Sequence, residues 1–205
     1  MKEIGSAVSY HVKSIENANL QDEVGRLKNR VADLEAAADE AEQYSRRNCL
    51  IFSGVGESVN ENTDDKVMEV CEKHLGVKLK SSDIDRSHRL TNHARVNKGS
   101  PSESNSKQKN PPRPRNIIMK FSNYRAREAV YAARSKLKGL QAAIFINENL
   151  TRKRAQLFWR VKKANYGHVE KVWTQDGRVM AKNKSGKKVA LTSEKDVEKL
   201  DQLKE

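Results

Sequence analysis

The feature of this sequence that most constrains its fold is a heptad repeat near the N-terminus. Leu20, Leu27 and Leu34 recur every seven residues, and Val24 and Val31 lie between them. Apolar residues therefore alternate in steps of four and three, which is typical of a coiled-coil seam with valine at a and leucine at d. A single amphipathic helix packed on a globular core is the alternative. The coiled coil is favoured because the seam is narrow and the rest of the helix surface is almost wholly polar.

Charged residues beside the seam fit parallel helices. Glu23 at g faces Lys28 at e of a neighbouring parallel chain, and Arg30 at g faces Glu35 at e. Valine at a with leucine at d favours two strands, but the segment from Arg30 to Glu35 resembles the Arg-h-x-x-h-Glu trimerisation motif of short coiled coils, where h is apolar. We therefore predict a parallel homotrimer, with a dimer as the second choice. The predicted oligomerisation residues are Leu20, Val24, Leu27, Arg30, Val31, Leu34 and Glu35.

Charge is distributed unevenly along the chain. Residues 1–45 hold five basic and nine acidic side chains, net −4, whereas the remaining 160 residues hold 35 basic and 18 acidic ones, net +17. An acidic helical segment joined to a strongly basic body predicts an anionic partner of that body, most often nucleic acid. Charge that serves solubility alone is the weaker explanation, given the size of this surplus.

Composition limits the class of protein. With 36% hydrophobic and 33% charged residues, the 205-residue chain suits a helical rod with one or two small domains. No window approaches ~18 uninterrupted apolar residues, so we predict no membrane span. The N-terminal segment lacks the apolar core of a signal peptide, which predicts a cytoplasmic protein with the nucleus as a second location. Cys49 and Cys71 occupy apolar periodic positions and are interpreted as buried thiols, not as a disulfide or metal ligands.

Residues 46–148 are predicted to form one domain from two strand–helix–strand units. Apolar runs bounded by turn residues alternate with amphipathic segments that carry helix-start signals. The resulting βαββαβ order is the ferredoxin-like arrangement that RNA-recognition-motif (RRM) domains use. The predicted strands are 49–54, 81–90, 115–121 and 143–147, and the predicted helices are 63–75 and 123–136, the second of which should bury Ala126, Ala129, Val130 and Ala133.

A low-complexity segment, residues 91–114, interrupts this domain. It contains all four prolines of the chain, and Glu103 is its single acidic residue. Such a composition cannot bury apolar surface, so we predict a disordered basic loop. A linker between two domains is the alternative. A loop is favoured because the strand–helix–strand unit before it is too small to fold alone and its complement follows directly.

Residues 149–205 are predicted to form a small domain. A basic helix begins near Leu150, and the turn dipeptide Asp176-Gly177 joins two strands of a hairpin. A short strand and a final helix follow, and the block should lean on the preceding domain because it is small. The predicted fold class is therefore α+β, with a parallel coiled coil at 1–45, an RRM-like domain at 46–148 and a small α+β domain at 149–205.

Several short segments, taken together, resemble segments of known protein families. The chain passes from its coiled coil through YSRRN (44–48) into a strand, and later holds DRSHRL (85–90) and PRNIIMKF (114–121) before a helix with AAR (132–134). These segments, in this order, resemble the RNA-binding protein of the first open reading frame of LINE-type (non-LTR) retrotransposons. The last block, with INENLT (146–151) and VWTQDGR (172–178), is similar to the C-terminal domain of baculovirus "few polyhedra" (FP) proteins. The retrotransposon resemblance implies homotrimers that coat single-stranded RNA, act as nucleic-acid chaperones and assemble ribonucleoprotein particles.

RRM domains usually stack bases on aromatic residues of their two central strands. Here Ile117, Met119 and Phe121 are expected to face the helices with Leu50 and Phe52, which leaves no aromatic residue on the outer face of these strands. Affinity should then come from phosphate contacts, depend steeply on salt and read little sequence.

The predicted nucleic-acid-binding residues are Arg46, Arg47, Arg86, Arg89, Arg113, Arg115, Lys120, Arg125, Arg127, Arg134, Arg152, Lys153 and Arg154. The family resemblance supports Arg46, Arg47, Arg89, Arg115, Lys120, Arg134 and Arg154 in particular. Tyr124, Tyr166, Trp159 and Trp173 could also stack a base, although core packing is the favoured interpretation of both tryptophans.

The sequence holds no pattern that predicts catalysis. Gly54-Val55-Gly56 lacks the third glycine and the Lys-Ser/Thr pair of phosphate loops, and the five histidines have no ligand spacing. We predict a non-enzymatic protein without cofactor or metal that binds single-stranded RNA, with single-stranded DNA as a second ligand. The rival hypothesis is a viral or cellular scaffold of the FP type that binds protein or membrane surfaces. A coiled-coil adaptor of the cytoskeletal kind is a third possibility, but it would not explain the RRM-like order of strands and helices.

Overall fold

The computed structural model describes residues 2–91, 113–139, 143–164 and 167–203. The chain forms two compact units, residues 1–42 and residues 43–205. The predicted basic loop at 91–114 lies outside the described residues except for its first residue and its last two. The domain boundaries predicted at 46 and 149 stay predictions.

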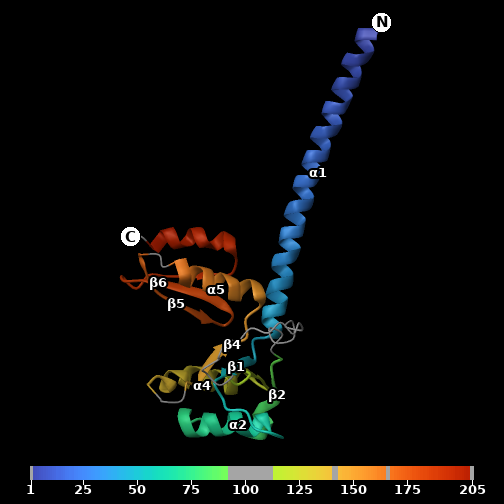
Figure 1. The fold of residues 1–205 in the computed structure, drawn as a ribbon. Helices are drawn as coiled ribbons and strands as arrows, with labels where there is room; N and C mark the ends of the chain where they lie inside the picture. The colour runs from blue at the N-terminus through green and yellow to red at the C-terminus, as the bar shows by residue number, and fades with distance from the viewer. Residues whose placement is uncertain (1, 92–112, 140–142, 165–166, 204–205) are drawn as a thin grey trace, which may run out of the picture. The chain divides into compact units, whose positions relative to one another are not determined.

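The N-terminal segment is one continuous α-helix, α1 (Lys2–Ser45), drawn in blue in Figure 1. The predicted seam residues form a stripe along it that is open to solvent, and Leu20, for example, is 62% exposed. The helix is thus confirmed, whereas association through the seam stays a prediction. Within the described ranges, no helix combines the length and the apolar character that a membrane crossing requires.

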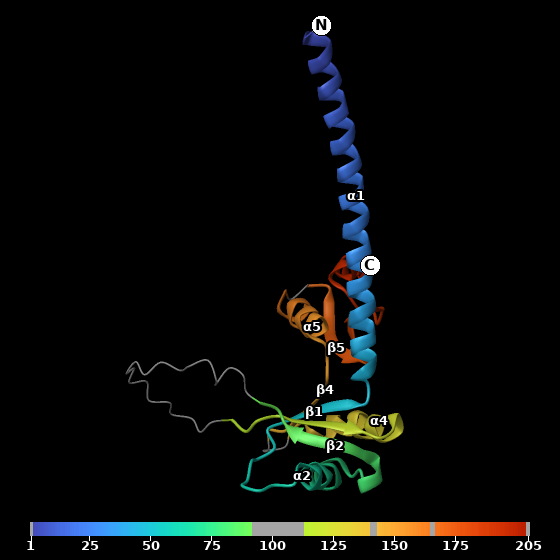
Figure 2. The same cartoon turned by 90° about the vertical axis from the view of Figure 1, so that its right-hand side faces the viewer.

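Residues 49–148 form a mixed α/β layer in the predicted order of elements. Its sheet has the strand order β2-β3-β1-β4, and each neighbouring pair is antiparallel. Figure 2 shows these strands with the two helices beside them. The elements are β1 (Cys49–Ser53), α2 (Thr63–Val70), β2 (Ile84–Arg89), β3 (Ile117–Phe121), α4 (Tyr124–Ala133) and β4 (Phe145–Glu148), with short turns η1 (Cys71–Leu75), η2 (Ser81–Asp83) and η3 (Arg134–Leu137).

The core of this layer lies between one face of the sheet and the two helices. Leu50, Phe52, Ile117, Met119 and Phe121 are buried in one cluster with side chains of α2 and α4. Their alternation along β1 and β3 confirms the predicted inward face. The residues between them point to the opposite face, which we call the outer face of the sheet.

Helix α4 differs from its prediction in the residues that it buries. It buries Arg127, Val130 and Tyr131, whereas Ala129 is exposed and Ala126 and Ala133 are only partly buried. The expectation of an alanine face was wrong at Ala129 because an arginine and a tyrosine are buried instead. A buried arginine is tolerated when a carboxylate neutralises it, and one does so here.

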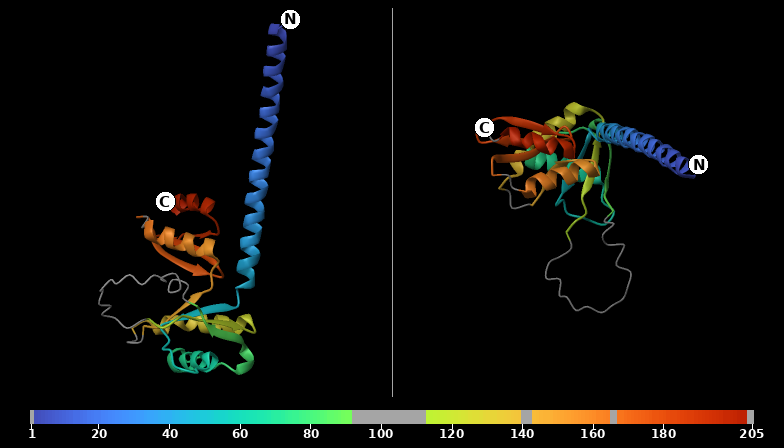
Figure 3. Two further views of the ribbon diagram at one scale, coloured as in Figure 1. Left: turned by 45° about the vertical axis from the view of Figure 1, so that its right-hand side comes forward. Right: turned by 90° about the horizontal axis from the view of Figure 1, so that it is seen from above.

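Residues 152–203 form a second, smaller layer, which Figure 3 shows from two further sides. Its core joins Leu157 and Val161 of the helix, Val179 and Ala181 of the sheet, and Leu200. The hairpin turn at Asp176-Gly177 has positive φ at both residues, 50° and 75°, as the predicted turn dipeptide requires. The elements are α5 (Arg152–Ala164), β5 (Val169–Gln175), β6 (Arg178–Asn183), β7 (Lys188–Leu191) and the 3-10 helix η4 (Glu194–Leu203), with strand order β5-β6-β7.

Polar side chains join the two layers. Gln43 is buried; its amide donates to the carbonyl of Asn149 (3.1 Å) and accepts from the backbone N–H of Thr151 (2.9 Å). A Cβ on Gly177 would lie 2.5 Å from the Cγ of Gln43, so the hairpin turn needs glycine at this approach. The Tyr131 hydroxyl contacts the carbonyl of Thr174 at 3.2 Å. The small layer therefore does lean on the larger one, through hydrogen bonds.

Candidate nucleic-acid interface

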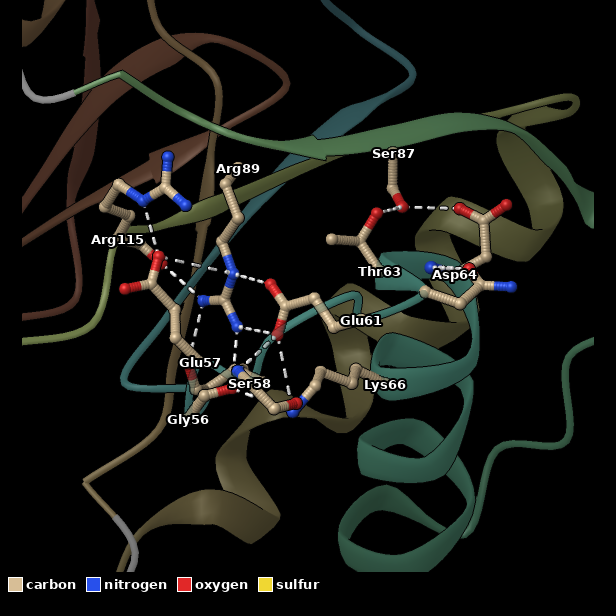
Figure 4. Close-up of polar contacts among 12 residues, drawn as sticks. Gly56, Glu57, Ser58, Glu61, Thr63, Asp64, Lys66, Ser87, Arg89 and Arg115 are labelled. Carbon is tan, nitrogen blue, oxygen red and sulfur yellow. Dashed lines mark hydrogen bonds and ion pairs between the residues drawn. The ribbon is translucent and has the colours of Figure 1, made fainter.

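Two groups stand out among the predicted basic residues because of the acceptors around them. Arg89 belongs to the first group, and Figure 4 shows its surroundings. Its side chain is only 5% exposed and forms a two-pronged ion pair with Glu61, at 2.6 and 3.1 Å. It also donates to the carbonyls of Val55 (2.8 Å) and Gly56 (2.7 Å). The guanidinium of Arg89 therefore fastens the end of β2 to the loop after β1.

These contacts lower the pKa values of the carboxylates at this end of the sheet. The hydrogen bond from Arg89 lowers the pKa of Glu61 to about 2. Arg115, which is half-exposed, pairs with Glu57 and lowers the pKa of that carboxyl as well. Lys66 adds a further positive charge 3.4 Å from Glu61. We call the set of Glu57, Glu61, Arg89 and Arg115 the Arg89 network; in it each arginine is matched by a carboxylate.

Two more of the predicted residues are buried in the junction between the layers. Arg127 pairs with Glu148, and its guanidinium lies 4.7 Å from the centre of the Tyr131 ring. Arg154 donates to the carbonyl of Gly177 at 3.0 Å. Both side chains are almost fully buried, so they hold the fold together and are not exposed to a polymer such as RNA.

The second group lies on the outer face of the sheet. Arg86 of β2 is directly opposite Lys120 of β3, which is in turn opposite Cys49 of β1. Burial raises the pKa of the Cys49 thiol, and the charges of Lys120, Arg46 and Arg86 act in the opposite direction. Three cations from three separate segments are thus close enough to act on one group. We call Arg46, Arg86 and Lys120 the Cys49 cluster.

Arg86 and Lys120 of this cluster are less enclosed than Arg89. Lys120 pairs with Asp85 at 2.7 Å, but both side chains are more than two-fifths exposed. Arg86 is exposed, and Arg46 donates to the side-chain oxygen of Asn149 at 3.1 Å and to the carbonyl of Leu150 at 3.3 Å. Arg86 and Lys120 therefore place positive charge where solvent can reach it.

Other predicted cations surround tyrosine rings. The guanidinium of Arg47 lies 4.8 Å from the centre of the Tyr44 ring and 5.6 Å from that of Tyr124. Arg134 stacks on Tyr131 at 3.6 Å. Arg113, Arg125, Arg152 and Lys153 are exposed. Arginines held on aromatic rings keep their planar donors oriented, which suits contact with phosphate.

Two exposed aromatic residues were not recognised as such from the sequence. Phe145 on β4 is 60% exposed and lies on the outer face, because its neighbours Ile144 and Ile146 are buried. The alternation of residues 144–146 carried this signal. Trp159 is 62% exposed, so the expectation that it packs in the core was wrong, while Trp173 is half-buried. Tyr166 lies outside the described residues.

Among the residues that the structure describes, no three side chains of His, Cys, Asp or Glu gather where they could hold a metal ion. Burial raises the pKa of the second thiol, Cys71, to about 12, so it is not a nucleophile at neutral pH. The outer face presents cations from β2, β3 and the start of β1, with Phe145 on β4.

Comparison with known proteins finds one likeness, in the C-terminal layer. Residues 151–201 match the family model described as baculovirus FP protein domain 2. This match confirms the FP likeness of the last block and covers α5, the three-stranded sheet and most of η4. No curated protein matches the chain.

Proposed function

We propose that this protein is a non-enzymatic binder of single-stranded nucleic acid, RNA in the first place, and a nucleic-acid chaperone. The observation that carries the proposal is the Cys49 cluster. Arg86 and Lys120 lie opposite each other on the outer face of the sheet, and the charge of Arg46 also acts on Cys49 beside them. A face that gathers cations where solvent can reach them is suited to a polyanion.

The chemistry of that face favours phosphate contacts over base reading. Arginine and lysine bind phosphate oxygens in any sequence, and each contact releases counterions from the polymer. The central strands offer Ile51 and Ile118 at the outer face, which give little stacking surface. Binding should therefore be steep in salt and nearly independent of sequence.

The exposed stripe of α1 supports self-association as the second part of the proposal. Large apolar side chains that recur every three to four residues on a solvated helix are stabilised when identical helices cover them. A parallel homotrimer would place several basic bodies on one strand of RNA, and linked sites bind far more tightly than single ones. The likeness to LINE-type retrotransposon proteins, and the RRM-like interpretation of the β2-β3-β1-β4 sheet, extend the proposal to ribonucleoprotein particles.

The test is a salt titration of RNA binding. The double variant Arg86→Ala/Lys120→Ala removes two phosphate contacts, so the slope of log K against log salt should fall by about 1.4. At 0.1 M salt the same law gives a loss in affinity of about 25-fold. Mixed-sequence single-stranded RNA in filter binding or fluorescence anisotropy measures both quantities, and analytical ultracentrifugation with and without the RNA reports the stoichiometry.

The matched control is Lys73→Ala/Lys78→Ala, which removes two exposed positive charges away from the sheet's outer face. It should leave the slope close to that of the unmodified protein. Equal losses in the two variants would mean that net charge alone drives binding. A protein that sediments as a monomer and ignores RNA in dilute buffer would contradict the whole proposal.

A second candidate function draws on the family match at residues 151–201. It is a scaffold of the FP type whose basic body binds acidic protein or membrane surfaces. Anionic lipid vesicles and an acidic polypeptide, offered in place of RNA at the same salt, separate the two candidates.

A further inference from the structure

Helix α5 exposes a tryptophan that the fold does not use. Trp159 is 62% exposed, whereas Leu157 and Val161 on the same helix are buried in the core of the small layer. Indole is among the largest apolar side chains, and leaving it in water forgoes a sizeable gain from burial. An exposed tryptophan on a well-packed helix therefore indicates a contact made outside the protein.

The surroundings of Trp159 are strongly basic. No acidic residue occurs within α5, which holds six lysines and arginines. Steps of four, three and four residues place Arg152, Gln156, Trp159 and Lys163 on one stripe, and all four are exposed. Within the described ranges, neither Arg152 nor Lys163 forms an ion pair with a carboxylate. The indole thus lies between two cations that are available to an anion.

Neighbouring side chains hold the indole in place. Phe158 meets it edge to face, with ring centres 5.3 Å apart and planes at 74°. The Lys162 ammonium lies 5.2 Å from the centre of the Trp159 ring. Since the ring is braced in this way, it loses less conformational freedom when it binds than a free side chain would.

We propose that Trp159 stacks on an unpaired base of single-stranded nucleic acid, while Arg152 and Lys163 contact the adjoining phosphates. This inference rests on the proposed function and adds to it a stacking site outside the sheet. Stacking needs an exposed base face, which a duplex hides. The site therefore gives the protein a preference for single strands that phosphate contacts alone do not provide.

A membrane is a poorer partner for this face. A helix that binds lipid buries an apolar face, but that face of α5 is already packed on the sheet through Leu157 and Val161. What remains exposed is a basic stripe with one indole. A single indole between positive charges suits base stacking, because one aromatic ring is enough to stack on one base.

Tryptophan fluorescence tests the proposal in the full-length chain. Trp159 and Trp173 are the two tryptophans, so Trp173→Phe leaves Trp159 as the sole reporter. A mixed-sequence single-stranded RNA oligonucleotide should quench its emission, whereas the same RNA as a perfect duplex should not. Vesicles of anionic phospholipid form the third titration. A change in emission with vesicles and none with single-stranded RNA would overturn the proposal.

Affinity measurements separate the stacking site from the proposed function. Trp159→Ala should weaken binding of single-stranded RNA about 5- to 150-fold, leave duplex binding unchanged and leave the salt slope unchanged. Trp159→Phe should recover part of the loss, and Gln156→Ala on the same stripe should cost nothing. If the unmodified protein binds single strands and Trp159→Ala binds them equally well, the stacking site is wrong and the proposed function stands. If the unmodified protein binds no nucleic acid, both fail.

Discussion

Arg86 and Arg89 lie three residues apart on one strand, yet they belong to regions of opposite character. Arg89 points inward into a network where Glu61 and two carbonyls take up its donors. Arg86 points outward, opposite Lys120, into the Cys49 cluster. The comparison teaches that a basic residue's role is decided by which carboxylates the fold brings to it. Arg89 is held inside the protein, whereas Arg86 and Lys120 of the Cys49 cluster are open to solvent.

The largest expected difference between the two regions is in stability. Arg89→Ala removes a buried guanidinium and leaves Glu61, which is partly buried, with Lys66 as its remaining cation, so it should lower the free energy of unfolding by about 1–3 kcal/mol. Arg86→Ala removes an exposed charge and should change it by less than about 0.5 kcal/mol. Urea unfolding of both variants, followed by circular dichroism, measures this. Equal losses of stability in the two variants would show that Arg89 contributes no more to the fold than Arg86 does.

Acid should weaken the Arg89 network. The folded pKa of Glu61 is about 2, below its ordinary value of 4.5. Its contribution to stability is therefore fully present above about pH 4.5 and is lost as the pH falls towards 2. In Glu61→Gln that part of the acid sensitivity should be absent. Unfolding midpoints in urea at about pH 6 and about pH 3 test this, with Glu72→Gln as the exposed control; an unaltered pH profile in Glu61→Gln would refute the assignment.

Arg115 is intermediate between the two regions: it belongs to the Arg89 network through Glu57, but its side chain is half-exposed. Arg115→Ala should weaken binding to every RNA sequence about equally and flatten the salt slope by about 0.7. A loss confined to some sequences would contradict a phosphate contact.

The smallest expected effect comes from the carboxylate of the same pair. Glu57→Gln leaves Arg115 without its partner, so RNA binding should tighten a few-fold at low salt and the salt slope should steepen. Fluorescence anisotropy at two salt concentrations can detect a change of this size in RNA affinity. Weaker binding would show that Glu57 positions Arg115 and does not compete with the RNA.

Much of the local structure could be predicted because it depends on neighbours in sequence. The apolar alternation of β1 and β3 predicted their inward faces, and Asp176-Gly177 predicted the hairpin. The periodicity near Leu20 predicted the long helix, although its partners stay a prediction. Helix α4 was placed correctly, with Asn123 at its start, but its buried face was chosen by apolar character alone.

The features that could not be foreseen from the sequence share one physical cause. Arg89, Arg127 and Arg154 look like phosphate contacts in the sequence, because the glutamate or carbonyl that takes up each charge lies at least 20 residues away. Trp159 looks like a core residue because its size favours burial, and only the packing of Leu157 and Val161 shows that the core is complete without it.

The sequence by itself determined the long helix, the order of strands and helices, the uneven charge and the hairpin turn, because each follows from local backbone preference and composition. The tertiary structure alone decided which cations are neutralised, which meet at Cys49 and which aromatic rings stay in water. Electrostatic pairing and burial depend on distances between groups that are remote in the chain, and those distances exist only after folding.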